Sequence, residues 1–389
     1  MKIGLYISDI LLRAGGTEAN CAYIVYALQK KFDYPEITVL SEKYKNIDIK
    51  DNNLVPRLNS LFGLSIENIN VNLELIPTNK TNFIQRAFFG HRIKNASRKY
   101  DVFFNCSMNS YTFEAKYNII IIHFPPYSKT KSDIVKKYPF LYFYALLNNL
   151  LFSRGYDLYI TYSLFTTEWL EKIWHIGLEK AVMIDPAVGL VLPSKNEKTN
   201  SIFVCSRIEQ SKNIEALISA YLSCEILKKT YKLIIAGAVV EETISYFEKL
   251  RKISSDYIDF ISFHENPSRS DIENYYSLSK IFWHAKGYGV DEKTNPYDLE
   301  HFGLTTVEAM SAGCVPVVIN KGGQKEIVEN GVNGFRWDTP EELVEKTVYL
   351  IQHEDEREKM AENAIEKAKH YSLDNFTENL GKVLKSKLV

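Results

Sequence analysis

The sequence predicts an α/β protein with two doubly wound units of parallel strands. Short apolar runs of strand length alternate with helical patterns in the first half of the chain, and the same alternation restarts after a break. The length of 389 residues exceeds the size at which one core usually keeps growing, so two domains are expected. Two such units would face each other across a cleft, at the carboxyl ends of their strands, where open α/β folds bind ligands.

The first half of the chain has five apolar runs of strand length. They cover residues 2–8, 36–41, 101–107, 117–124 and 157–163. Between the first two runs, residues 15–32 have the pattern of a turn that enters an amphipathic helix. We therefore expect an N-terminal domain at residues 1–187.

The second half begins where the pattern lapses into Pro, Gly, Ser and charged residues, which are typical of a linker. We expect this linker at residues 188–200 and a second domain at residues 201–370. Residues 371–389 are expected to form a helix that packs back toward the N-terminal domain. The predicted strands of the second domain are 201–206, 231–237, 258–263, 280–285 and 315–320, and its predicted helices include 213–229, 240–254 and a helix that begins near Thr305.

Composition and charge exclude several classes of protein. A formal net charge of -1 gives no overall field that would hold nucleic acid, so no nucleic-acid partner is expected. The five cysteines are scattered without a C-x-x-C pair, which indicates reduced thiols in a cytoplasmic protein. No apolar run approaches the length of a membrane span, and the N-terminal run is too short for a signal peptide. The sequence thus predicts a cytoplasmic protein that is at most peripheral to a membrane.

Two carboxylates, Glu300 and Glu308, stand in the stretch EHFGLTTVEAMSAG. A helix that begins near Thr305 has free backbone N–H groups at a positive dipole end, and Gly303 permits close approach of a ligand to the backbone. Glu300 then lies just outside the helix and Glu308 on its first turn. Carboxylates there would repel a bare phosphate but accept hydrogen bonds from sugar hydroxyls, so a nucleotide sugar fits both features. Capping acids without a ligand are the alternative.

Further candidate residues follow predicted strands. Arg207 and Lys212 lie between a strand and a helix, where a planar guanidinium and a point charge suit phosphates, although two exposed cations can also be a solvated face. Gly15 and Gly16 can bring backbone N–H groups against a phosphate or sugar, or form a plain tight turn. His123 ends an apolar run before two prolines and is either a site residue or a structural histidine.

These motifs together resemble the retaining family 4 glycosyltransferases, also called glycosyl transferases group 1, which have the GT-B fold of two Rossmann-like domains. The resemblance rests on the E-x7-E spacing of Glu300 and Glu308, the A-x-G-x-P-V strand entry and the G-G-x-x-E turn at Gly322. The segments CSRIEQSK, GGTE and HFPP extend it over most of the chain. Residues 282–303 further resemble the mannosyltransferase-type and bacterial surface-polysaccharide branches of the family.

The resemblance implies an enzyme that transfers hexoses, of the EC 2.4 type. It would be a retaining, metal-independent glycosyltransferase that moves a hexose from GDP-mannose or a UDP-sugar to a glycan or lipid-linked acceptor in cell-surface polysaccharide or glycolipid synthesis. A nucleotide-sugar epimerase or hydrolase on the same fold, and a non-catalytic partner subunit, are the alternatives. The chain has no D-x-D pair, and neither a metal nor another cofactor is expected.

The resemblance also assigns roles to residues. Arg207 and Lys212 would offset charge on the leaving diphosphate, and His123 would contact the transferred sugar. Glu300 would bind hydroxyls of that sugar without acting as a nucleophile, and Glu308 would bind the ribose. The implied catalytic residues are His123, Arg207, Lys212 and Glu300, and the implied donor-binding residues are Gly15, Gly16, Arg207, Lys212, His264, Phe302, Gly303, Leu304, Thr305 and Glu308.

Two segments of the first domain mix aromatic, leucine and basic residues. They cover residues 83–100 and 131–156. Such segments can lie on an anionic membrane surface, which would suit a lipid-linked acceptor at the inner face of the membrane. Buried helices that contact the sheet are the alternative.

Overall fold

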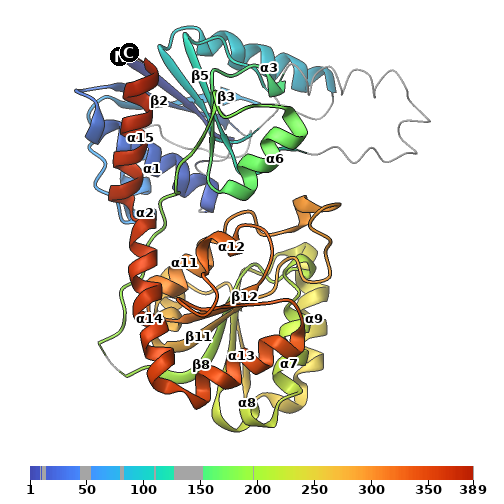
Figure 1. The fold of residues 1–389 in the computed structure, drawn as a ribbon. Helices are drawn as coiled ribbons and strands as arrows, with labels where there is room; N and C mark the ends of the chain where they lie inside the picture. The colour runs from blue at the N-terminus through green and yellow to red at the C-terminus, as the bar shows by residue number, and fades with distance from the viewer. Residues whose placement is uncertain are drawn as a thin grey trace. The chain divides into compact units, whose positions relative to one another are not determined.

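The computed structural model describes residues 1–8, 10, 15–43, 54–78, 83–108, 111–126, 152–195 and 197–388. Contacts within the chain divide it into two compact units (Figure 1). Unit 1 consists of Met1–Ala187 and Leu373–Val389, and unit 2 consists of Val188–Ser372. The predicted architecture of two α/β units with parallel sheets is confirmed.

Unit 1 contains a seven-stranded parallel sheet in its described residues, with the strand order β3-β2-β1-β4-β5-β6-β7. This order places the first strand inside the sheet, between β2 and β4, as in doubly wound folds. The strands are β1 (Lys2–Tyr6), β2 (Glu36–Lys43), β3 (Val71–Pro77), β4 (Val102–Asn105), β5 (Tyr117–Ile122), β6 (Leu158–Thr161) and β7 (Ala181–Met183), and the helices are α1 (Gly16–Lys31), α2 (Leu54–Phe62), α3 (Phe83–Ser97), α6 (Leu164–Trp174) and α15 (Leu373–Leu388).

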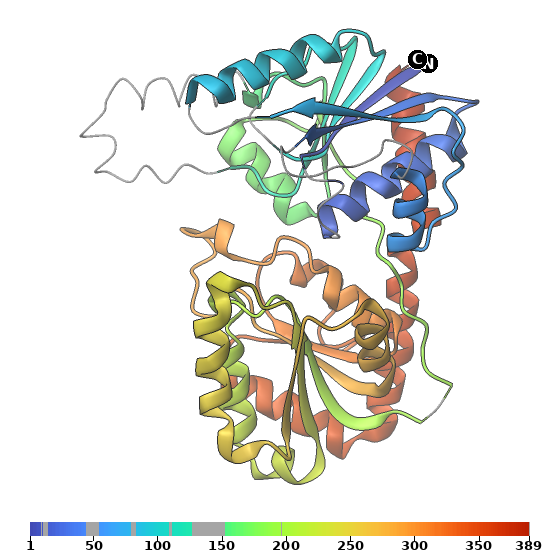
Figure 2. The same cartoon turned by 180° about the vertical axis from the view of Figure 1, so that it is seen from behind.

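Both faces of this sheet are covered by helices (Figures 1 and 2). Because successive strand residues point to opposite faces, Leu5 packs in the cluster that holds α1 and α15, whereas Tyr6 packs in the cluster that holds α3 and α6. On α15, the buried residues Phe376, Leu380 and Leu384 follow a helical spacing and pack in the same cluster as the α1 core. The last helix of the chain is therefore part of unit 1.

Unit 2 contains a six-stranded parallel sheet with the order β10-β9-β8-β11-β12-β13. Ile202 and Val204 of β8 face one apolar cluster, and Phe203 and Cys205 face another, so helices cover both sides. The strands are β8 (Thr199–Cys205), β9 (Lys232–Gly237), β10 (Ile261–Glu265), β11 (Ser279–His284), β12 (Val315–Ile319) and β13 (Phe335–Trp337), and the α-helices are α7 (Ile214–Leu222), α8 (Glu225–Thr230), α9 (Ile244–Ile253), α10 (Arg269–Leu278), α11 (Leu304–Ser311), α12 (Gln324–Ile327), α13 (Pro340–Gln352) and α14 (Glu354–Ala368).

Some elements differ from those expected. The helix predicted at 213–229 is broken into α7 and α8, and Ser223 Oγ donates to the Ala220 carbonyl oxygen at 2.7 Å, a local bond that competes with a continuing helix. The strands β3, β7 and β13 were not predicted. Residues expected as a linker lie along unit 2, where the Val188 N–H donates to the Tyr371 carbonyl and the Val191 N–H donates to Ser311 Oγ.

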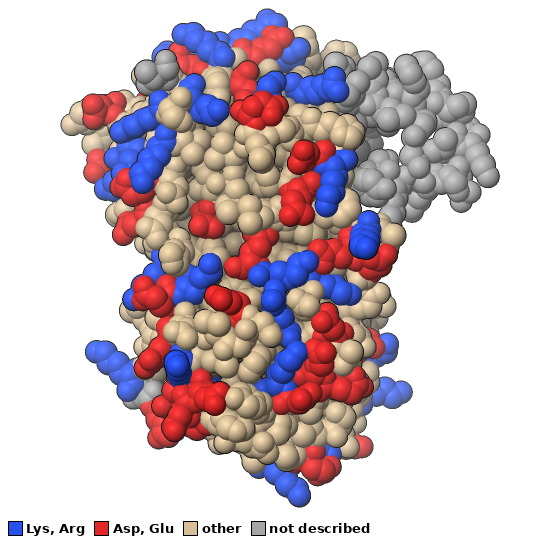
Figure 3. Space-filling view, in the orientation of Figure 1, with Lys and Arg blue, Asp and Glu red and all other residues tan. Residues whose placement is uncertain are grey.

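The surface of the described residues mixes both signs of charge, and Figure 3 shows acidic and basic side chains interspersed. None of the helices in the described part of the chain is both long and apolar enough to cross a bilayer. The segment 83–100 contains α3, whose Phe89 and Ile93 are buried while Phe88 is exposed. Most of the segment 131–156 lies outside the described residues.

Candidate active site

The candidate site of unit 2 lies at the carboxyl edge of its sheet. β8, β11 and β12 are neighbours and run parallel, so the loops that follow them leave the sheet at the same edge. The loop after β8 contains Arg207 and leads into a 3-10 helix, η2 (Gln210–Lys212). The loop after β11 contains Lys286, and Glu300 lies shortly before α11.

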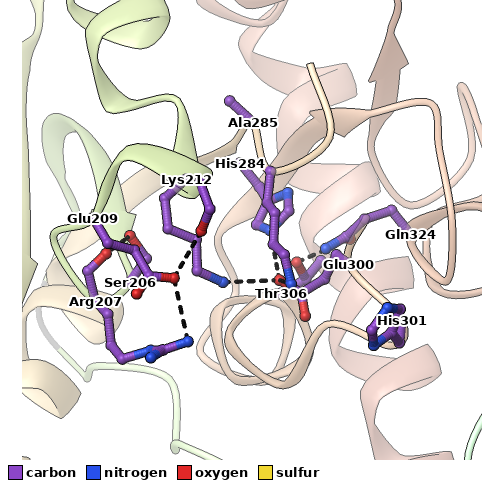
Figure 4. A network of polar contacts seen from close by, with 12 residues as sticks. Ser206, Arg207, Glu209, Lys212, His284, Ala285, Glu300, His301, Thr306 and Gln324 are labelled. Carbon is purple, nitrogen blue, oxygen red and sulfur yellow. Dashed lines mark hydrogen bonds and ion pairs between the residues drawn. The ribbon is translucent and has the colours of Figure 1, made fainter. Parts of the chain in front are cut away.

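Glu300 is the centre of a polar network (Figure 4). Its Oε2 atom lies 3.1 Å from Lys212 Nζ, 3.4 Å from His284 Nε2 and 4.0 Å from Lys286 Nζ. The side chain of Glu300 is 21% exposed, and that of His284 is 5% exposed. The structure therefore brings together two of the predicted catalytic residues, Lys212 and Glu300, which are 88 positions apart in sequence.

The electrostatics of this network keep Glu300 ionised at neutral pH. Burial alone would raise the pKa of the Glu300 carboxyl, but Lys212, His284 and Lys286 together hold that pKa well below 4.5. Burial lowers the pKa of the Lys286 ammonium, and the Glu300 charge offsets part of this change. Burial also lowers the pKa of His284, so its imidazole is neutral at physiological pH.

Two glycines after β12 hold the backbone of Glu300 in place. The Gly323 N–H donates to the Glu300 carbonyl oxygen at 2.9 Å. A Cβ atom at Gly322, whose φ is +58°, would lie 2.3 Å from the same carbonyl oxygen, and one at Gly323 would lie 2.4 Å from the His301 carbonyl oxygen. Only glycine permits this close approach of the two loops. The Gly-Gly turn thus positions the carboxylate through its main chain.

The start of α11 is fixed by a fully buried amide. Gly303, with φ +133°, precedes the helix, and a Cβ atom there would lie 2.7 Å from Gln324 Nε2. Thr306 Oγ1 donates to Gln324 Oε1 at 3.0 Å, while Gln324 Nε2 has no hydrogen-bond partner among the described residues. Leu304 is exposed and Thr305 is half-buried, so the first turn of α11 is accessible. Phe302 instead packs its ring against Tyr371, 5.3 Å away between centroids.

The prediction that Glu308 lies on the first turn of α11 is wrong. The helix begins at Leu304, directly after the turn at Gly303, and Glu308 is its fifth residue. Glu308 Oε1 accepts a hydrogen bond from Arg269 Nη1 at 2.5 Å, and Oε2 accepts one from the Tyr276 hydroxyl at 3.1 Å. Burial raises the pKa of Glu308, and Arg269 opposes this change. Glu308 therefore belongs to a second network that shares none of these partners with Glu300.

The remaining predicted residues of unit 2 differ in how firmly they are held. Arg207 is 71% exposed and its Nη2 lies 3.2 Å from Glu209 Oε1, so its guanidinium can reorient toward a ligand. His264, on β10, is held by the Tyr275 hydroxyl, 2.9 Å from Nδ1, and by Ser262 Oγ, 3.2 Å from Nε2. Its ring contacts the Tyr275 ring at 4.6 Å between centroids.

Three predicted residues belong to unit 1. His123 directly follows β5, its Nε2 atom is buried without a partner among the described residues, and burial lowers its pKa to about 4. The imidazole is therefore neutral at pH 7. Its ring lies 5.9 Å from the ring of Tyr162, whose hydroxyl donates to Asn20 Oδ1.

The glycine turn before α1 has its own carboxylate. The Gly15 N–H donates to Glu18 Oε2 at 3.0 Å, and Gly16 is the first residue of α1. An acid three positions into a helix commonly satisfies a free N–H at the helix start in this way. The N–H that was expected to face a phosphate is therefore occupied by Glu18 in this structure.

Sequence reasoning missed four partners of the two acids, namely His284, Lys286, Arg269 and Tyr276. His284 and Lys286 had a usable signal, because a polar residue near the end of a predicted strand, or directly after it, lies at the carboxyl edge. Arg269 and Tyr276 had no such signal, because they lie on α10, 39 and 32 positions before Glu308 in the sequence. Within the described ranges, no group of three His, Cys, Asp or Glu side chains is placed to hold a metal ion.

In comparisons with known proteins, residues 193–367 match the family model described as "Glycosyl transferases group 1". A sucrose synthase of Melioribacter roseus is 33% identical over 175 residues, which are 40% of this chain and 20% of that protein. A GDP-Man:Man(3)GlcNAc(2)-PP-Dol alpha-1,2-mannosyltransferase of Dictyostelium discoideum is 25% identical over 59% of this chain and 43% of its own length. The matched region thus spans less than half of either relative.

Solved structures resemble the whole chain at low sequence identity. The Anabaena protein HepE, solved in complex with UDP, superposes with a TM-score of 0.74 at 16% identity and covers 99% of this chain and 100% of its own. A glycosyltransferase from Rickettsia africae gives a TM-score of 0.70 at 18% identity, with 100% of this chain and 98% of its own covered. These likenesses establish the fold.

The opposite pKa shifts of Glu300 and Glu308 predict opposite effects of pH on stability. The pKa of Glu300 is lowered by folding, so its contribution to stability is present above pH 4.5 and is lost as the pH falls below that value. We expect the difference in melting temperature between the wild type and Glu300→Gln to shrink as the pH falls below 4.5. The measurement is thermal unfolding across pH 7 to 3.

Glu308→Gln serves as the matched control. Because the pKa of Glu308 is raised by folding, protonation of Glu308 favours the folded state. The melting temperature of the wild type should therefore rise relative to that of Glu308→Gln as the pH falls from 7 toward 4.5. A change of the same sign in both pairs of proteins would contradict the two environments described above.

Proposed function

We propose that this chain, a member of the glycosyl transferases group 1 family with the GT-B fold, transfers a hexose from a nucleotide-diphosphate sugar to a glycan or lipid-linked acceptor. The observation that supports this most is the Lys212–Glu300 pair, at 3.1 Å, on the carboxyl edge of the sheet within the matched region. A cation for phosphate and a carboxylate for hydroxyl groups are the two groups that a nucleotide sugar requires.

The diphosphate would bind Arg207 and Lys212. Arg207 is exposed and can turn from Glu209 toward a phosphate. Lys212 would leave Glu300 for the same phosphate, and Glu300 would keep His284 and Lys286 as neighbours. Positive charge that is already in place where the leaving group becomes more negative stabilises the transition state. Either GDP-mannose or a UDP-sugar would fit this scheme.

The transferred sugar would lie beside Glu300, and the glutamate would accept hydrogen bonds from its hydroxyl groups. In a retaining transfer, the bond from the anomeric carbon to the phosphate breaks and the acceptor oxygen bonds to the same face of the sugar. The proton of the acceptor hydroxyl then passes to the leaving phosphate. His123, neutral at pH 7, would contact the sugar from unit 1 as a hydrogen-bonding group without charge.

The acceptor would bind to unit 1. The transfer would take place in the cytoplasm, as a step of cell-surface polysaccharide or glycolipid synthesis. A lipid-linked acceptor would be met at the inner face of the membrane. The exposed Phe88 on α3, in a segment that also contains basic residues, supports a peripheral contact. Co-sedimentation of the purified protein with anionic liposomes tests this contact, and equal recovery with neutral and anionic liposomes would argue against it.

Substitution of Lys212 tests the diphosphate site. We expect Lys212→Ala to weaken binding of UDP or GDP by about 1.5 to 3 kcal/mol, roughly 10- to 150-fold, because a charge-assisted hydrogen bond is lost. Isothermal titration calorimetry measures this change. Lys249→Ala is the control, since Lys249 forms an ion pair with Glu215 at 2.9 Å on the surface of unit 2. Unchanged affinity in Lys212→Ala would remove Lys212 from the site.

The two acids should differ in kind when they are replaced. Glu308→Gln should weaken UDP or GDP and the matching nucleotide sugar alike, because Glu308 would bind the ribose. Glu300→Gln should leave the affinity for the diphosphate unchanged or raise it, since Lys212 loses a competing carboxylate, while turnover falls. Calorimetry and kcat with each variant separate these outcomes. Equal losses of diphosphate affinity in both variants would contradict the division of the ligand.

Chelation of metals should leave activity intact. Arg207 and Lys212 supply the positive charge that a divalent cation supplies in metal-dependent enzymes, so excess EDTA should change the initial rate by less than about twofold. The rate is measured with and without added magnesium or manganese. Full loss in EDTA that either metal restores would overturn this part of the proposal.

A further inference from the structure

Lys286 is a mostly buried cation that is not among the proposed ligands of the diphosphate. Its side chain is 17% exposed and stands two residues beyond the end of β11. Glu300 Oε2 lies 4.0 Å from the Lys286 ammonium nitrogen, and that distance is too long for a direct hydrogen bond. An ammonium group has three donors, and a ligand that displaces water from this partly exposed group can accept a hydrogen bond from it.

The loop that contains Lys286 is held from two sides. Asn213 Nδ2 donates to the carbonyl oxygens of Ala285, at 3.2 Å, and Tyr288, at 3.4 Å. Gly287 has φ +102°, and a Cβ atom there would lie 2.8 Å from a methyl carbon of Leu299, the residue before Glu300. Lys286 is therefore positioned relative to both Lys212, which precedes Asn213, and Glu300.

The spacing of Lys286 and Glu300 suits one hydroxyl oxygen. An oxygen atom can lie about 2.8 Å from both Nζ and Oε2 when these atoms are 4.0 Å apart. A hydroxyl group can donate to the carboxylate and accept from the ammonium at the same time, which a phosphate oxygen cannot do. The negative charge of Glu300 would also repel a phosphate at this position, whereas it does not repel a neutral hydroxyl group.

We propose that Lys286 and Glu300 jointly bind one hydroxyl group of the transferred sugar, and that Lys286 thereby determines which nucleotide sugars the site accepts. This inference rests on the proposed function. A sugar that lacks this hydroxyl, or holds it in the other configuration, leaves an ammonium and a carboxylate without their partner in a half-buried place. Sites built to hydrogen-bond a hydroxyl discriminate strongly against analogues that lack it.

Binding of deoxy sugars tests the inference. The probes are UDP, GDP, UDP-glucose and GDP-mannose, followed by the monodeoxy analogues of whichever nucleotide sugar the wild type binds more tightly. We expect one analogue to bind the wild type at least about tenfold more weakly than the parent sugar. In Lys286→Met, whose side chain is unbranched, uncharged and one atom shorter, the same analogue should bind within about threefold of the parent. Affinity for UDP or GDP alone should stay within about twofold of the wild type.

Two control variants complete the design. Lys249→Met removes a lysine that is 57% exposed and should preserve the full discrimination. Lys286→Leu, which likewise has no hydrogen-bond donor, replaces Lys286→Met if thermal unfolding shows that the methionine variant does not fold.

Each outcome separates the inference from the function on which it rests. Absence of binding of every probe to the wild type would overturn the proposed function. If the wild type binds, full discrimination by the Lys286 variants would show that Lys286 only positions Glu300, and the inference would be wrong. If the Lys286 variants lose as much affinity for UDP or GDP alone as for the nucleotide sugar, Lys286 binds phosphate. That result would also overturn the inference.

Discussion

Three side chains face a single oxygen atom of Glu300, and the candidate site depends on this arrangement. A half-buried carboxylate would otherwise bind a proton more readily, but Lys212, His284 and Lys286 hold its pKa well below the ordinary value. The arrangement requires that β8 and β11 be neighbours and that the Gly-Gly turn approach the Glu300 main chain. Strand order, turn chemistry and charge thus all contribute to one ionised group.

Glu300 and Glu308 are close in sequence but have opposite electrostatic environments. The first lies within 4.0 Å of two ammonium groups and a neutral imidazole, and the second has one arginine that is also bound by Glu273 and by the Gly189 carbonyl oxygen. Folding consequently favours the charged form of Glu300 and disfavours that of Glu308. Glu308 lies in the second turn of α11 and is bonded by two residues of α10, whereas Glu300 lies in the loop before the helix.

Most strands and the positions of the main site residues could be predicted from the sequence, because buried parallel strands are long apolar runs and glycine turns between them are distinctive. β3 was missed because its residues are mostly half-buried and its pattern is weak. Lys286 was overlooked although it directly follows a predicted strand. Arg269 could not be found, since its contact with Glu308 depends on the packing of α10 beside α11, which no local pattern specifies. Local chemistry was visible in the sequence, and tertiary neighbours were not.

The membership of α15 in unit 1 has a consequence for synthesis of the protein. Unit 2 is an insertion between Ala187 and Leu373, and its two ends are joined by the hydrogen bond from the Val188 N–H to the Tyr371 carbonyl. A ribosome therefore delivers every residue of unit 2 before it delivers Phe376, Leu380 and Leu384, which complete the core of unit 1. Unit 1 begins first but must wait for the last helix, with the α1 face that receives it still uncovered. During that interval, the apolar side chains of α1 that pack against α15 in the folded protein have not yet met that partner.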